Sequence, residues 1–193
     1  VGLFAIGIIV TLQFTLQRDM TIGYAAVNPA NIEMSVLNVD DALVNLAEGV
    51  DGVASAEAAR VFSLRVKDSS GQWVTLSFNA FPDLRNKKIN RVKLVAGKWP
   101  PRTRQVVLDE YKFGKLGIPI GGMLTVELAD GSTRMLQVTG EIKDQTIGAS
   151  GSAGGFFMAP AQGYITSETL GWLGQGGSYN RLYLTVSSQP DDE

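Results

Sequence analysis

The chain has 193 residues, 17 basic and 19 acidic side chains, a formal net charge of −2, and neither histidine nor cysteine. It therefore has no disulfide, cysteine nucleophile, Ser-His-Asp triad or ordinary zinc site, and Mg²⁺ or Ca²⁺ would need carboxylates or carbonyls. The 45% hydrophobic content is that of a globular chain with one domain or two small ones, and the near-zero charge argues against nucleic acid as a partner.

Residues 1–27 indicate that the chain is attached to a membrane. The run from Val1 to Val10 is apolar throughout, and the first charged side chain is Arg18. A membrane span needs about 20 apolar residues, so this run is too short to cross a bilayer by itself. We interpret residues 1–27 as the end of a transmembrane helix and a stalk. The alternatives are a signal-peptide remnant and a buried N-terminal helix. Because the chain starts with valine rather than methionine, we expect a fragment or a processed product. With the apolar run, we interpret it as a fragment of an integral membrane protein.

The next segments predict a strand-helix-strand unit. They are a strand at 31–36, a helix over Asp41–Glu48 and a strand at 53–60 that runs into 61–67. Asp40 precedes the helix as a capping residue, and Gly49 ends it. A unit of this length is typical of a βαβ or split βαβ motif.

The middle of the chain predicts mostly strands. The expected strands are residues 73–78, 89–95, 106–108, 123–128 and 133–142, with a short helix at 109–116 that ends at Gly117. Asp130-Gly131 between two alternating runs is a strong hairpin signal. After the small-residue loop 148–155 we expect a brief strand at 156–158, a linker, a helix at 166–173 and a last strand at 180–186.

The order and spacing of several short motifs form a resemblance to a known family. The motifs are Gly97-Lys98-Trp99, residues 105–110, Lys115-Leu116-Gly117, Ile120-Gly121, residues 124–126, Gly131, and residues 138–142, 156–160 and 182–186. Together they resemble the extracytoplasmic core domain of MacB-like and FtsX-like ABC transporter permeases. Gly122 stands where that family usually has an aspartate, and residues 111–113 are bulkier than usual.

The resemblance implies an α+β fold with a discontinuous, porter-like subdomain. Residues 28–60 and 145–193 would form this strand-helix-strand subdomain from both chain ends, and residues 61–144 would form a smaller strand-rich insertion. The implied function is to couple ATPase-driven helix motion to export or extraction of a lipid, lipoprotein, peptide or drug-like cargo, or to signalling. The implied partners are a cytoplasmic ABC ATPase, a second copy or second permease, and the cell membrane, with this domain on its extracytoplasmic side.

Two other classes of function stay open at this point. One is a stand-alone, membrane-anchored extracellular binding module. The other is a hydrolase that uses carboxylates or Mg²⁺, which would require two carboxylates to converge in a pocket.

We predict no catalytic, cofactor-binding or metal-binding residue, and we expect a protein that is not an enzyme. The neighbouring acids Asp40-Asp41, Asp109-Glu110 and Asp191–Glu193 point apart from one another on a helix or strand, and helix capping accounts for the first two pairs. The loop 148–155 lacks the lysine and hydroxyl residue of a P-loop, so we interpret it as a surface loop.

Basic residues are concentrated between Leu84 and Leu108, a stretch without an acid. They are Arg85, Lys87, Lys88, Arg91, Lys93, Lys98, Arg102 and Arg104. One interpretation is contact with anionic lipid or an acidic partner. The other is the solvated face of an edge strand, where lysines discourage edge-to-edge pairing.

Overall fold

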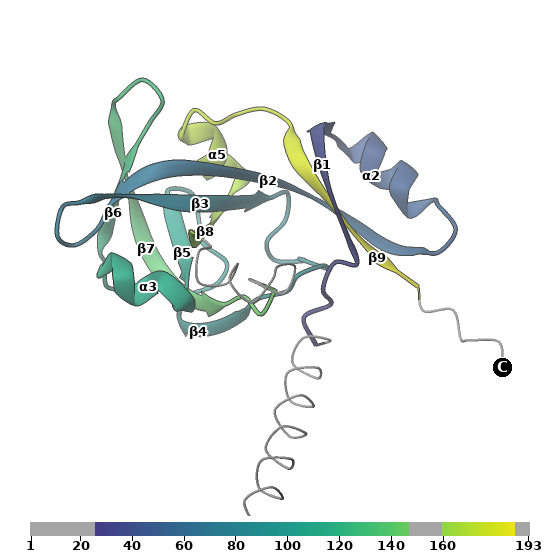
Figure 1. The fold of residues 1–193 in the computed structure, drawn as a ribbon, viewed down its shortest axis with the longest axis horizontal. Coiled ribbons are helices and arrows are strands. Elements are labelled where there is room, and N and C mark those ends of the chain that lie inside the picture. Colours follow the sequence, from purple (N-terminus) through teal and green to yellow (C-terminus); the bar gives the residue numbers. More distant parts are fainter. Residues whose placement is uncertain (1–25, 147–159, 188–193) are drawn as a thin grey trace, which may run out of the picture.

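The fold is organised around one long strand, β2 (Val53–Lys67), in a computed structural model that describes residues 26–146 and 160–187. The other strands are β1 (Ile32–Val39), β3 (Trp73–Phe81), β4 (Lys93–Gly97), β5 (Gln105–Asp109), β6 (Met123–Glu127), β7 (Thr133–Lys143), β8 (Ala161–Thr166) and β9 (Tyr179–Val186). The helices are α2 (Asp41–Glu48), α3 (Glu110–Leu116) and α5 (Ser167–Trp172). Figure 1 shows β2 passing from one side of the molecule to the other.

Six strands form a closed ring, which we call the barrel. β2 pairs with β3, β3 with β8, β8 with β5, β5 with β7, β7 with β6, and β6 again with β2. Closure leaves these six strands without the open edges that promote aggregation. Its interior is filled by apolar side chains, among them the fully buried Leu76, Phe78, Leu124 and Leu136.

A second group of strands, which we call the terminal sheet, lies on the other half of β2. β9 pairs antiparallel with both β1 and β2, so β1 and β2 run parallel with β9 between them. With α2 as the connection, this is the split form of the predicted βαβ motif. Val39, Leu182 and Leu184 are buried here, and Leu43 and Val44 of α2 pack against them.

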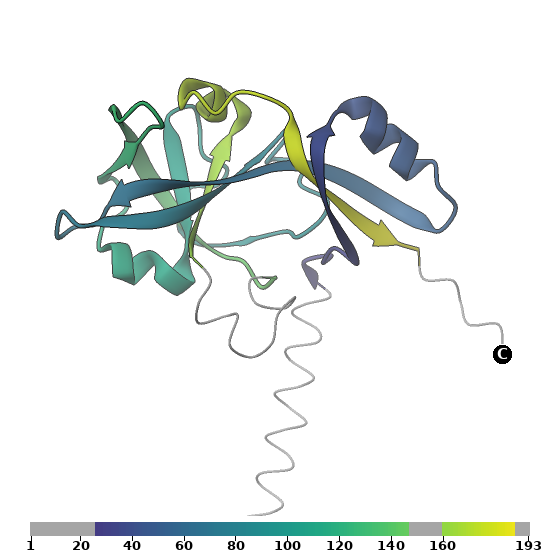
Figure 2. The same cartoon turned by 45° about the horizontal axis from the view of Figure 1, so that its top comes forward.

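β2 changes partners at Arg60. Residues 53–59 pair with β9, and residues 60–67 pair with β3. At the change of partner, the Asn180 side chain takes the place of a neighbouring strand: its Oδ1 accepts from Val61 N at 2.8 Å, and its Nδ2 donates to Val61 O at 2.9 Å. A single strand is thus shared by the barrel and the terminal sheet (Figure 2).

Most of the predicted local elements are confirmed. Asp40 caps α2 and Asp109 caps α3, through side chains that accept from the first-turn amides, and Gly117 ends α3 with a φ of 64°. The 123–128 and 133–142 hairpin is present as β6 and β7, with Gly131 in the turn at a φ of 79°. These elements were predictable because their signals are local in sequence.

Two strand predictions are wrong. The strand expected at 89–95 is β4 at Lys93–Gly97, because Asn90 adopts a φ of 51° and interrupts the extended backbone. Ile89 is instead fully buried in a loop. The linker expected before residue 166 is the strand β8, which has a glycine at its centre and acquires its partners from β3 and β5, distant in sequence.

The division into subdomains stays a prediction. β1, α2 and β9, which come from the chain ends, lie together in the terminal sheet. β8 and α5 also fall within residues 145–193, but β8 pairs with barrel strands, and Leu170 and Leu173 pack into the barrel core. The predicted segments 1–25, 147–159 and 188–193 lie outside the described residues.

Candidate functional site

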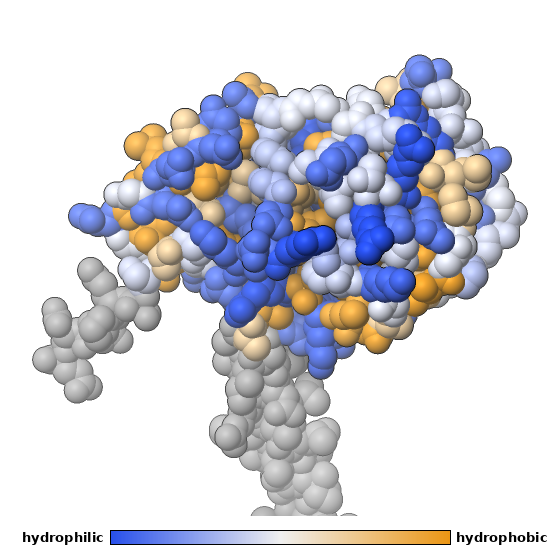
Figure 3. All heavy atoms as spheres, turned by 180° about the vertical axis from the view of Figure 1, so that it is seen from behind, coloured by the Kyte–Doolittle hydropathy of each residue, from blue (hydrophilic) through white to orange (hydrophobic). Residues whose placement is uncertain are grey.

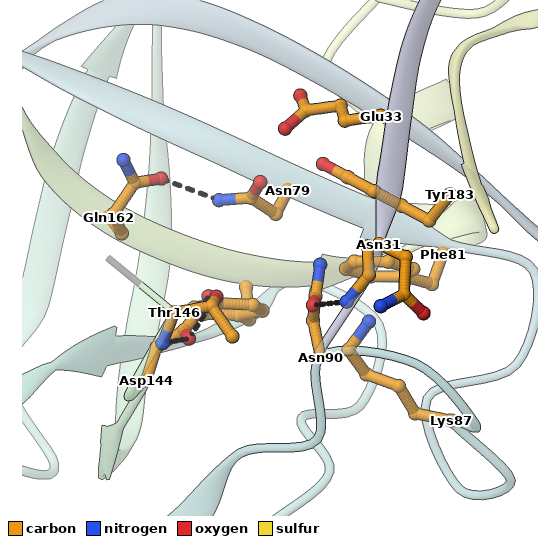
Figure 4. A pocket seen from close by; sticks show the side chains of 12 residues that line it. Asn31, Glu33, Asn79, Phe81, Lys87, Asn90, Asp144, Thr146, Gln162 and Tyr183 are labelled. Atoms are coloured by element: carbon orange, nitrogen blue, oxygen red, sulfur yellow. Dashed lines mark hydrogen bonds between the residues drawn. The ribbon is translucent and has the colours of Figure 1, made fainter. Parts of the chain in front are cut away.

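A polar pocket of about 250 Å³ lies where the barrel meets the terminal sheet. Strands β1, β3, β8 and β9 contribute to it, together with the segment before β1, the loop before β4 and the loop after β7 (Figure 4). Its lining residues are Ala30, Asn31, Glu33, Asn79, Phe81, Lys87, Asn90, Asp144, Thr146, Gln162, Tyr164 and Tyr183.

Aromatic rings form one side of the pocket. Tyr164 stacks on Phe81 with ring centroids 6.5 Å apart, and Trp99 meets Tyr164 edge-on at 5.9 Å. Tyr183 lies beside them in the same buried cluster. Burial raises the pKa of both tyrosines, so their hydroxyls are neutral donors and acceptors at physiological pH.

A buried ion pair lies next to these rings. Lys87 Nζ is 3.2 Å from Glu57 Oε2 of β2, and it lies 3.4 Å from the centroid of the Phe81 ring. Desolvation lowers the pKa of Lys87, and the Glu57 carboxylate opposes that effect. The lysine is therefore compensated inside the protein and is not a free cation.

Two carboxylates from distant segments approach each other at the edge of the pocket. Asp109 Oδ2 accepts from Asp144 N at 2.9 Å, while Asp144 Oδ2 accepts the Tyr164 hydroxyl. Burial raises the pKa of Asp109 to about 6. The remaining oxygens accept from Tyr111 N and from both donors of Thr146.

These two carboxylates are consequently engaged in holding the backbone. Each of their four oxygens has a protein donor, and of the two only Asp144 lines the pocket. Among the residues that the structure describes, no group of three or more acidic side chains is arranged to hold a metal ion.

The chain leading into β1 is fastened to the loop before β4 by a set of hydrogen bonds, which we call the latch. Asn90 N donates to Asn28 O at 2.9 Å, and Arg91 N donates to Val27 O at 2.7 Å. The two asparagine side chains add reciprocal bonds, from Asn28 Nδ2 to Lys88 O and from Ala30 N to Asn90 Oδ1. The latch therefore joins residues 27–30 to the loop that carries Lys87.

The basic residues between Leu84 and Leu108 lie in several different environments. Lys87 is buried, Lys88 pairs with Glu48 at 3.6 Å, and Arg91 Nη2 donates to Ala26 O at 3.0 Å. Arg104 lies over the Trp172 ring, and Lys93 lies on β4, whose only strand partner within residues 26–146 and 160–187 is β7. The side of the molecule opposite to Figure 1 shows hydrophilic and hydrophobic residues intermixed (Figure 3).

The pocket residues were not predicted from the sequence. Asn79 is an amide in the mostly apolar strand β3 and is only 8% exposed. A buried amide of this kind is the local signal that could have indicated a polar cavity. Gln162, Asp144 and Tyr183 carry no such signal, because they reach the pocket from β8, the end of β7 and β9.

No protein-family model and no curated protein sequence matches the chain. Its fold does match solved structures of extracellular and periplasmic domains of transporters. The extracellular domain of the noncanonic ABC-type transporter YknZ from Gram-positive bacteria aligns with a TM-score of 0.52 and 15% identity, over 84% of this chain and 81% of that one.

Two further structures are similar. A permease domain from Porphyromonas gingivalis gives a TM-score of 0.51 at 12% identity, over 86% of this chain and 71% of that one. The periplasmic region of MacB from Actinobacillus actinomycetemcomitans gives 0.49 at 16% identity, over 82% and 69%. The chain thus shares its fold with the YknZ extracellular domain and with the Porphyromonas gingivalis permease domain, in agreement with the motif resemblance. Within residues 26–146 and 160–187, no helix has the length and apolar character of a membrane span.

Proposed function

We propose that this chain is the extracytoplasmic domain of an ABC transporter permease and that it transmits helix motion rather than carrying out chemistry. The observation that carries the proposal is the fold shared with the YknZ extracellular domain over 84% of the chain. The order and spacing of the sequence motifs also support it. The similar structures are domains of a transporter and a permease.

The latch supplies a physical route for such motion. A displacement of residues 26–30 acts on the loop at 88–91 through the latch hydrogen bonds. From that loop it reaches β2 through the Lys87–Glu57 ion pair. Since β2 belongs to both the barrel and the terminal sheet, a load on the chain that leads into β1 is distributed over the whole domain.

The implied partners follow from this role. A cytoplasmic ABC ATPase would supply the energy, a second copy or second permease would complete the assembly, and the membrane would hold the segment before residue 26. The cargo class is a lipid, lipoprotein, peptide or drug-like molecule. The competing function is a membrane-anchored binding module that works without an ATPase.

The first test is the complete gene product. The transporter proposal requires three further membrane spans and a neighbouring gene for an ATPase that copurifies with the permease. A product with one membrane anchor and no ATPase would favour the binding module.

The second test loosens the latch in the complete transporter. The double variant Asn90→Gly, Arg91→Ala removes one side-chain bond of the latch, from Ala30 N to Asn90 Oδ1, and the neighbouring bond from Arg91 Nη2 to Ala26 O. Glycine keeps the left-handed backbone of residue 90. We expect transport to fall while basal ATP hydrolysis continues. Arg102→Ala, an exposed arginine of the same stretch, is the control, and equal transport by both variants would contradict the mechanism.

A further inference from the structure

The polar pocket contains side-chain amides that the protein holds by one hydrogen-bonding atom, while the other polar atom has no protein partner among the described residues. The Gln162 Oε1 accepts from Asn79 Nδ2 at 2.7 Å, which leaves Gln162 Nε2 and Asn79 Oδ1 without a partner among the described residues. Asn31 and Asn90 likewise use Oδ1 to accept backbone amides at 3.0 and 2.8 Å. Each side chain is thus fixed by one end and offers the other to a ligand.

The Tyr183 hydroxyl belongs to the same set. It lines the pocket, and among the described residues it makes no hydrogen bond. Figure 4 shows it directed toward Asn79 and Glu33. The pocket therefore offers amide donors, one amide acceptor and one hydroxyl that can do either.

The charges that line the pocket are already compensated. Lys87 is paired with Glu57, and Glu33 Oε1 lies 3.2 Å from Arg181 Nε. Asp144 accepts three hydrogen bonds, from Thr146 and from Tyr164. An anionic ligand would find no unpaired cation here. The Asp144 carboxylate makes no ion pair among the described residues, but both of its oxygens already accept hydrogen bonds, so the site favours a neutral polar ligand.

The size and shape of the pocket limit the class of ligand further. The volume of about 250 Å³ is below the roughly 300–1,000 Å³ of pockets that hold drug-sized ligands, so one ring is the natural occupant. The rings of Tyr164 and Tyr183 provide an apolar wall, since Lys87 lies over the Phe81 ring, and the amides provide polar groups around it. A ring with an apolar face and a rim of hydroxyls matches both the apolar wall and the polar amides.

We propose that this pocket binds a single neutral sugar ring, with Asn79, Gln162 and Tyr183 as the main hydrogen-bonding residues and the tyrosine rings as its apolar wall. The proposal stands on the pocket alone and does not depend on the transport function proposed above. A free monosaccharide and a sugar at the end of a larger glycan present the same chemistry to it.

The test is a ligand-observed NMR titration of the full 193-residue chain in a detergent without sugar groups. The probes are glucose, galactose and N-acetylglucosamine, with glucuronate, glucosamine and an N-acetyl amino-acid amide as charged and peptide-like competitors. We expect saturable binding of at least one neutral sugar in the millimolar range and weaker binding of its charged analogues.

Two conservative variants assign the binding to the pocket. Tyr183→Phe removes only the hydroxyl, and Gln162→Glu keeps the oxygen that accepts from Asn79 while it removes the free amide donor. Each should weaken sugar binding about tenfold, because one hydrogen bond to a neutral ligand is lost. The matched controls are Tyr179→Phe, whose hydroxyl bonds Ser167 outside the pocket, and the exposed Gln72→Glu.

Thermal melting of each variant shows whether it is folded. Equal affinity in the pocket variants and their controls would overturn the proposal. So would the absence of saturable binding at concentrations far above the millimolar range, or tighter binding of the charged sugars. If the amino-acid amide binds more tightly than every sugar, the pocket recognises a peptide instead.

Discussion

The buried carboxylate of Asp109 makes the stability of the fold depend on pH in an unusual direction. Burial raises its pKa from 3.8 to about 6, and the side chain is only 4% exposed. The folded state therefore disfavours the charged form. Above pH 6 the cost is (6 − 3.8) × 1.36, or about 3 kcal/mol, and it is relieved as the pH falls through 6 toward 3.8. About 2 kcal/mol of that relief falls between pH 7.5 and 4.5.

Other carboxylates with shifted pKa values change the stability of the fold outside the range from pH 7.5 to 4.5. Asp68, Asp83, Asp130 and Glu168 accept hydrogen bonds that lower their pKa values, so their contributions are lost only below their unfolded values of 3.8 to 4.5. Between pH 7.5 and 4.5 the dominant change among the groups with shifted pKa values is that of Asp109. Wild-type stability should accordingly rise on acidification through this range.

The perturbation is Asp109→Asn, measured by urea unfolding followed by tryptophan fluorescence at pH values from 7.5 to 4.5. Asparagine can still cap α3 through the bond from Tyr111 N, so the helix start is kept. The rise of about 2 kcal/mol should disappear. At pH 4.5 the variant should be less stable than wild type by about 1 kcal/mol, because Asp144 N loses a good acceptor.

Asp130→Asn is the matched control, since it is the same substitution at an exposed turn. It should retain the wild-type pH dependence. The reasoning fails if wild-type stability is flat or falls on acidification from pH 7.5 to 4.5, or if Asp109→Asn keeps the full slope.

Further substitutions test the packing of the fold. Gly140→Ala should destabilise the fold by about 2 kcal/mol or more, because its Cβ would lie 2.6 Å from a backbone oxygen, whereas Gly114→Ala in α3 meets nothing within 4 Å and should raise the melting temperature. Phe78→Ala in the fully buried barrel core should cost about 3–5 kcal/mol by urea titration, and a smaller loss would mean that the barrel can collapse around the cavity. Lys87→Met should lower the free energy of unfolding by about 3–5 kcal/mol, because it leaves Glu57 buried without its partner. Adding Glu57→Gln should restore part of this loss. No restoration would contradict the ion-pair assignment.

The sequence by itself determined the local elements. The side chains that begin α2 and α3, at Asp40 and Asp109, bond amides two or three residues away. The Asp130-Gly131 turn likewise depends on its immediate neighbours. Such signals survive in sequence because the interacting groups are adjacent along the chain. The order of these elements was also sufficient to indicate the transporter-domain fold.

The tertiary structure decided everything that depends on distant segments meeting. β8 is a strand only because β3 and β5 lie on either side of it, and its central Gly163 gave no strand signal. Asn79 and Gln162 are 83 residues apart and become hydrogen-bonded only through the parallel pairing of β3 with β8. The pocket could not be read from sequence for the same reason: side-chain orientation toward a shared cavity is set by strand register, which nonlocal pairing fixes.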